Sequence, residues 1–75
     1  MADKTLDLKG LQCPMPVLKT KKAVLALAPG ATIEIEATDP GAPGDMATWC
    51  ELSGNTLVES SEADGIFRFV IKRTA

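Results

Sequence analysis

Short stretches of alternating apolar and polar residues indicate β-strands in this chain. Leu6 and Leu8 alternate with polar neighbours, which predicts a short first strand over about residues 5–9. In residues 32–38, isoleucine and alanine alternate with two glutamates, the pattern of a strand with one buried face and one face in water. Both segments are therefore expected in a sheet that has a single apolar face.

Two further strands are predicted near the C-terminus. Residues 55–62 and 66–73 flank the sequence Ala63-Asp64-Gly65, and Asp-Gly is a strong signal for the turn of a β-hairpin. These two strands are therefore expected to pair with each other.

Prolines mark both ends of a predicted first helix. Pro14 suits the first helical position, where no N–H is needed, so Cys13 becomes the expected N-cap residue. The pair Pro29-Gly30 indicates that the helix has ended before it. The expected apolar side comprises Val17, Leu18, Val24, Leu25 and Ala28, with Lys21 in the same arc and Met15, Lys19 and Lys22 opposite.

A second, shorter helix is predicted after an irregular connection. Residues 38–45 are rich in glycine and proline, and the helix is expected from about Gly44 to Ser53, closed by Gly54. Asp45 would favour its first turn because a negative charge is stabilised at a helix N-terminus. Spacings of three and four place a stripe toward the sheet, formed by Met46, Trp49, Cys50 and Ser53.

The predicted order of elements is β-α-β-α-β-β. Two helices and four strands in 75 residues imply a two-layer α/β sandwich, in which both helices cover the apolar face of a four-stranded mixed sheet. No repeat or linker divides the chain, so residues 1–75 are expected to form a single domain with an ordered core over about residues 5–73.

Composition excludes several classes of function. A formal net charge of -2, with one Trp and two Phe, argues against direct nucleic-acid binding. The N-terminal residues lack the apolar stretch of a signal peptide, and the longest apolar run, residues 23–28, is too short to span a membrane. With two cysteines and no histidine, a zinc site is not expected. We therefore expect a cytoplasmic protein without membrane insertion, disulfide framework or metal.

Cys13 is the strongest candidate for chemistry. Between Leu8 and Ile33 the chain has four lysines and no acidic residue. A helix N-terminus and nearby lysines favour the thiolate, so we predict an accessible Cys13 with a lowered pKa. Pro14 and Pro16 would add rigidity and hold the sulfur outward. The alternative is that Cys13 is a small buried hydrophobe that happens to precede a helix.

Other residues near Cys13 have two interpretations. Met15, on the exposed side of the helix, is either an ordinary surface apolar residue or a docking contact for a partner protein. Lys19 and Lys22 would present positive charge to such a partner and speed association. Cys50 lies in the core-facing stripe and is expected to be a core cysteine, with a resolving thiol as the alternative.

These residues carry a resemblance to a known family. The run from Gly10 to Pro16, Gly-Leu-Gln-Cys-Pro-Met-Pro, lies between a predicted strand and helix and resembles the TusA/SirA-like family of small sulfur-carrier proteins. The likeness extends from about Leu6 to Arg73 and includes Lys21-Lys22, Pro29-Gly30, Asp39-Pro40, Asp45 and Trp49-Cys50. The loop DPGAPGD departs from the pattern, because small polar or basic residues would be expected there.

The resemblance implies a two-layer α/β sandwich and a sulfurtransferase function. Cys13 would accept sulfane sulfur as a covalent persulfide, with Gly10, Pro14 and Pro16 as supporting motif residues and no other cofactor. The donor would be a cysteine desulfurase or a rhodanese-type protein, and the acceptor a DsrE/TusD-like protein. The relay would serve tRNA thiolation, sulfur oxidation or cofactor biosynthesis. We expect a monomer that forms transient complexes.

Two alternative functions remain at this point. Cys13 and Cys50 would form a redox sensor if their sulfurs came within disulfide geometry. In the other alternative the domain is a non-catalytic binding module for a sulfur transporter or an enzyme, and Cys13 is incidental. Replacing each cysteine by serine separates the three hypotheses, because only the redox cycle needs both thiols.

Overall fold

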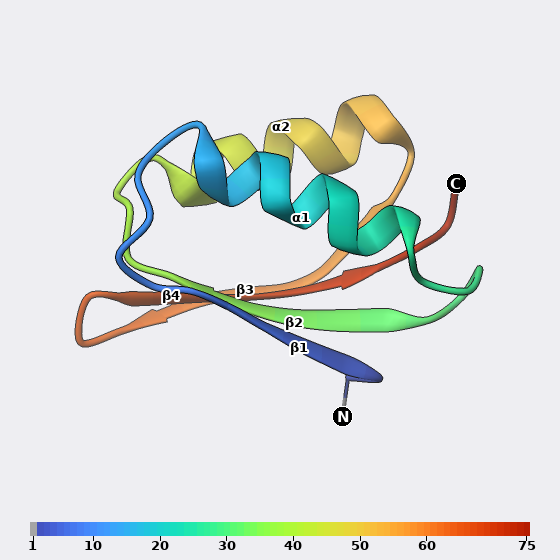
Figure 1. Cartoon of the computed structure of the whole chain (residues 1–75), viewed down its shortest axis with the longest axis horizontal. Helices are drawn as coiled ribbons and strands as arrows, with labels where there is room; N and C mark the ends of the chain where they lie inside the picture. The colour runs from blue at the N-terminus through green and yellow to red at the C-terminus, as the bar shows by residue number, and fades with distance from the viewer. Residues whose placement is uncertain (1) are drawn as a thin grey trace.

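The computed structural model describes residues 2–75 as one mixed sheet covered by two helices (Figure 1). The elements are β1 (Lys4–Leu8), α1 (Met15–Leu25), β2 (Thr32–Ala37), α2 (Ala42–Ser53), β3 (Thr56–Ala63) and β4 (Ile66–Lys72). The two helices lie side by side on one face of the sheet, with their N-termini at the same end of the molecule. The predicted order of elements and the two-layer architecture are confirmed.

The sheet combines one parallel and two antiparallel pairings. Its strand order is β1-β2-β4-β3, with β1 parallel to β2 and β4 antiparallel to both of its neighbours. The β3–β4 turn places Asp64 at a φ of 53° and Gly65 at a φ of 77°, the conformation in which Asp-Gly closes a tight hairpin. The hairpin predicted from the sequence is thus confirmed.

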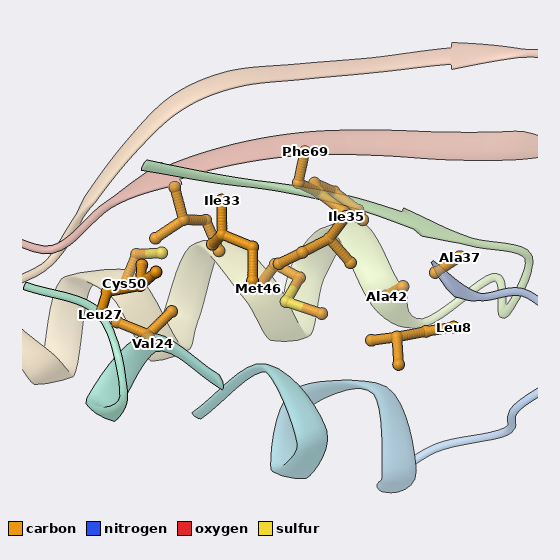
Figure 2. Packing of buried hydrophobic residues seen from close by; sticks show 11 residues of the cluster. Leu8, Val24, Leu27, Ile33, Ile35, Ala37, Ala42, Met46, Cys50 and Phe69 are labelled. Atoms are coloured by element: carbon orange, nitrogen blue, oxygen red, sulfur yellow. The ribbon is translucent and has the colours of Figure 1, made fainter. Parts of the chain in front are cut away.

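The core lies between the sheet and the helices, as the alternation in β2 predicts. Ile33, Ile35 and Ala37 are buried, and Met46 and Cys50 of α2 belong to the same buried cluster (Figure 2). The buried apolar residues are Leu8, Val24, Leu27, Ile33, Ile35, Ala37, Ala42, Met46, Cys50, Phe69 and Ile71. On the open face, Arg68 of β4 pairs with glutamates on both neighbouring strands, Glu34 of β2 and Glu59 of β3.

The buried face of α1 differs from the predicted one. Val24 is buried as expected, but Leu18 and Leu25 are exposed, while Pro16 and Thr20 are buried. The side chains of this helix are apolar over much of its circumference, so periodicity alone does not fix which arc meets the sheet. The prediction of an apolar side that includes Leu18 and Leu25 is therefore wrong.

The second helix begins earlier than predicted. It starts at Ala42, two residues before the predicted Gly44, and takes Pro43 into its first turn. Proline is tolerated there because the first-turn N–H groups have no partner within the helix. Its C-terminus agrees with the prediction: Gly54 has a φ of 81°, and its N–H donates to the Cys50 carbonyl at 3.1 Å.

Candidate functional site

Cys13 lies exposed in the turn between β1 and α1. It lines a shallow groove of about 350 Å³ between the two helices, together with Pro14, Val17, Asp45, Thr48, Trp49 and Leu52. These seven residues are called the thiol groove below. The exposed position agrees with the prediction of an accessible thiol and excludes the alternative that Cys13 is a buried hydrophobe.

The chain approaches Cys13 through a turn held to the end of β2. Gly10 has a φ of 85°, a left-handed conformation that glycine adopts without the cost of a side chain. Its N–H donates to Thr38 Oγ1 at 2.9 Å, and the Leu11 N–H donates to the Leu8 carbonyl at 3.2 Å. Gly10 therefore lets the chain turn from the sheet toward the helix.

The helix beyond Cys13 starts one residue later than predicted. Pro14 is the N-cap residue, Met15 begins α1, and Pro16 occupies the first turn with its side chain buried. Cys13 therefore precedes the N-cap, and the Cys13–Pro14 peptide bond is cis. Pro16 is tolerated in the first turn because the N–H that proline lacks would have no partner within the helix there.

The charge environment of Cys13 is opposite to the one predicted. The Cys13 thiol donates a hydrogen bond to Asp45 Oδ2 at 3.3 Å. This hydrogen bond, some desolvation of the sulfur and the charges of Asp45 and Asp39 all raise the pKa of the thiol. A carboxylate that accepts a hydrogen bond from the protonated thiol favours that form, and its charge disfavours the thiolate. The predicted lowering of the Cys13 pKa is therefore wrong.

Asp45 reaches the thiol through the arrangement of the helices. It stands in the first turn of α2, as predicted, and the parallel helices bring this turn beside the start of α1. Asp45 was predicted only as a residue favourable to its own helix. The contact between Asp45 and the thiol could have been inferred from two helices that lie on one face of the sheet with both N-termini at the same end, because this arrangement brings their first turns together.

The lysines do not gather around the thiol. Lys9 pairs with Asp7 and Glu36, at 3.2 and 3.1 Å. Lys19 and Lys22 line a different groove, of about 310 Å³, together with Leu6, Ala23 and Ala26. The prediction that lysines tune Cys13 is thus not supported, although docking at Lys19 and Lys22 stays a prediction.

Apolar side chains make up much of the lining of the thiol groove. Leu52 of the thiol groove is 82% exposed, and Met15, close to Cys13 along the chain, is 41% exposed, as its predicted position on the open side of the helix requires. Trp49 is half-buried and packs against the core. Sequence reasoning did not single out Leu52, because a single exposed leucine is common on protein surfaces.

Cys50 is a core residue, as predicted. Its side chain is 3% exposed, and burial raises the pKa of its thiol. Both cysteines are free thiols. Within residues 2–75 no cluster of three or more potential metal ligands occurs, and none of their helices is long and apolar enough to cross a membrane.

Comparison with known proteins agrees with this architecture. Residues 4–73 match the family model described as sulfurtransferase TusA. The sulfur carrier protein TusA of Allochromatium vinosum is 42% identical over 72 residues, covering 96% of this chain and 95% of the relative. The sulfur carrier protein TusA of Pseudomonas paraeruginosa is 38% identical over 73 residues, covering 97% of this chain and 92% of the relative.

A solved structure shows the same fold. The crystal structure of the SirA-like protein from Desulfitobacterium hafniense has a TM-score of 0.84 and 26% sequence identity, covering 96% of this chain and 99% of the other. The resemblance inferred from the motif around Cys13 is thereby confirmed. With nearly its whole length matched in sequence and in fold, the chain belongs to the TusA family of sulfur carrier proteins.

Proposed function

We propose that the protein accepts sulfane sulfur as a persulfide on Cys13 and passes it to a partner protein. The observation that carries this proposal is the exposed Cys13 thiol in a groove open to partners, in a chain of the sulfur carrier family. Thiolates are the nucleophiles of cysteine chemistry, and persulfide transfer needs no further catalytic group. The proposal includes no metal or organic cofactor.

Loading is a displacement at the outer sulfur of a donor persulfide. The Cys13 thiolate forms a bond to that sulfur while the bond between the two donor sulfurs breaks. The donor cysteine leaves as a thiolate and takes up the proton that Cys13 gave up. One thiol and one persulfide are present before and after the step, so no external oxidant or reductant is consumed. Unloading is the same reaction with an acceptor thiolate as the nucleophile.

The proposed partners are those that the resemblance to the TusA family implies. A cysteine desulfurase or a rhodanese-type protein would load Cys13, and a DsrE/TusD-like protein would unload it. Exchange between three proteins requires brief encounters, which suits a shallow groove better than a large permanent interface. Gly10 and the two prolines, Pro14 and Pro16, would support the reaction by fixing the turn that presents the sulfur.

A loading assay tests the assignment. Incubation with a cysteine desulfurase and cysteine should add the mass of one sulfur atom to the wild type and to Cys50→Ser, but not to Cys13→Ser. The two serine variants are matched controls, because each removes one thiol. Loading of Cys13→Ser would place the acceptor sulfur elsewhere, and loss of loading in a folded Cys50→Ser variant would favour a two-thiol redox mechanism.

A further inference from the structure

The thiol groove combines an apolar surface with negative charge next to the reactive sulfur. Asp45 contacts the thiol at 3.3 Å, and Asp39, in the connection before α2, adds a second negative charge. The two charged side chains that raise the pKa of the Cys13 thiol, Asp45 and Asp39, are both carboxylates. Two lysines of α1, Lys19 and Lys22, line the other groove.

Deprotonation of Cys13 in the free protein is therefore opposed by its surroundings. The thiolate would lie against the Asp45 carboxylate, and two like charges at this distance disfavour each other. A partner that covered the groove without neutralising Asp45 would make deprotonation of Cys13 still less favourable. Excluding water strengthens the repulsion between the thiolate and the carboxylate and leaves the carboxylate desolvated. A productive partner must therefore supply a compensating charge.

The rest of the groove indicates how such a partner would bind. Val17 of α1 and Trp49 and Leu52 of α2 line it beside Asp45, and Leu52 is 82% exposed. Apolar side chains of a partner gain free energy by covering this surface. Apolar contacts would hold the partner segment in place, while an acidic group at one end of the groove selects a positive charge.

We propose that Asp45 holds the Cys13 thiol in its protonated form in the free protein, and that a partner releases it by placing a cationic side chain against Asp45. The partner segment is thus apolar with a lysine or arginine next to its reactive cysteine. This inference rests on the proposed function, since it describes how the same thiol is activated. Asp45 is a positioning residue in this scheme, because it acts on the reaction through Cys13.

We call this control of the Cys13 thiol by Asp45 and a partner's cation the gate. No proton is gained or lost overall in the step that it controls. When the partner's cation pairs with Asp45, the carboxylate no longer opposes the thiolate, and Cys13 loses its proton to water. The thiolate then attacks the outer sulfur of the donor persulfide, and the departing donor thiolate is protonated from water. The cation is neither consumed nor changed. Free anionic persulfides lack this cation and are expected to react slowly, which confines sulfur transfer to basic partners.

Methanethiosulfonate reagents test the gate without any sulfur-relay protein. The Cys13 thiolate attacks their sulfenyl sulfur, a disulfide forms and methanesulfinate leaves, which mimics attack on sulfane sulfur. A cationic trimethylammonium-ethyl reagent and an anionic sulfonato-ethyl reagent differ chiefly in charge. We expect the wild type to react several-fold faster with the cationic reagent, relative to the ratio measured for a free cysteine peptide.

Three variants locate the cause of that ratio. Asp45→Asn should bring the cationic-to-anionic ratio close to that of the peptide, and should shift the pH profile of Cys13 alkylation by iodoacetamide to lower pH. Glu51→Gln removes a carboxylate from the same helix outside the thiol groove, and should leave both readouts near the wild-type values. Asp39→Asn should have a smaller effect than Asp45→Asn, because Asp39 acts through its charge alone. Circular dichroism checks that each variant is folded.

The outcomes separate this proposal from the proposed function. An unchanged ratio and pH profile in folded Asp45→Asn, or equal effects of Glu51→Gln, would overturn the gate even if the loading assay succeeded. Conversely, loading of Cys13→Ser would overturn the carrier assignment while leaving the thiosulfonate result valid. A slower alkylation of Asp45→Asn at pH values where the thiol is protonated would show that Asp45 assists deprotonation, which also contradicts the gate.

Discussion

Thr20 occupies a fully buried position on the face of α1 that packs into the protein. Its side chain is 0% exposed, and its Oγ1 has no hydrogen-bond partner among residues 2–75. A hydroxyl buried without a partner loses its hydrogen bonds to water and gains none in return. Thr20→Val replaces this hydroxyl by a methyl group in a side chain of nearly the same shape, so we expect the variant to be more stable than the wild type.

The expected gain follows from the cost of the unpartnered group. Leaving a buried polar group unsatisfied costs about 1–3 kcal/mol in protein mutational data, and valine and threonine have similar helix propensities. We therefore expect Thr20→Val to raise the free energy of unfolding by about 1 kcal/mol or more. For a domain of this size, each 1 kcal/mol corresponds to a Tm increase of roughly 4–8 °C.

Urea denaturation followed by circular dichroism and by the fluorescence of the single tryptophan, Trp49, measures this gain. Thr20→Ser is the matched control, because it keeps the hydroxyl and loses only the methyl group. That loss should cost about 1 kcal/mol through reduced apolar burial. The expected order of stability is valine, then threonine, then serine. The rate of Cys13 alkylation should stay the same in all three proteins.

A lower stability of Thr20→Val than of the wild type would refute this reasoning. It would mean that the hydroxyl has a partner in solution, such as a buried water or a main-chain carbonyl of the preceding helical turn. Equal stability of the two proteins would mean that the hydroxyl is satisfied only in part. Agreement between circular dichroism and fluorescence is required in each case, since it shows that unfolding is two-state.

Three further predictions concern the turn, the C-terminus and the buried thiol. Gly10→Ala should lower the free energy of unfolding by about 1–2 kcal/mol in urea denaturation, since Gly10 has a positive φ. Arg73→Ala should cost about 1–2 kcal/mol and loosen the end of α1 in hydrogen exchange, because the Arg73 guanidinium donates to the Leu25 and Leu27 carbonyls; unchanged exchange there would contradict this capping role. Burial raises the pKa of the Cys50 thiol, so the folded protein holds this proton more tightly than the unfolded chain does. The contribution of this difference to the free energy of unfolding is present at low pH and is lost as the pH rises above the usual thiol range. From about pH 8 to about pH 10, the wild type should therefore lose more stability than Cys50→Ala, and equal losses would show that Cys50 does not titrate on unfolding.

The local periodicities of the sequence determined most of the secondary structure. The alternation in residues 32–38 identified the buried face of β2, because side chains of a strand point to opposite sides in turn. Asp64-Gly65 fixed the hairpin, and Gly54 fixed the end of α2, because each of these residues adopts a positive φ. Such signals depend on a residue's own backbone and its nearest neighbours, so they can be recognised in the sequence without knowledge of the tertiary structure.

The orientation of α1 was decided by tertiary packing. The predicted and observed buried arcs share Val24, but the observed arc is turned toward Pro16 and Thr20 and leaves Leu18 and Leu25 in water. A helix with apolar residues over much of its surface can bury more than one arc. Its position beside α2 and over the sheet selects among them, and this choice has no signature within the helix itself.

The position of Cys13 was predictable from the sequence, but its electrostatics were not. The Gly-Leu-Gln-Cys-Pro-Met-Pro run indicated an accessible thiol between a strand and a helix, and the structure agrees. The count of charges along the chain indicated a basic environment, whereas Asp45, 32 residues away in sequence, lies 3.3 Å from the sulfur. Electrostatic interactions depend on separation in space, and only the packing of two parallel helices on one sheet face brought this carboxylate to the thiol.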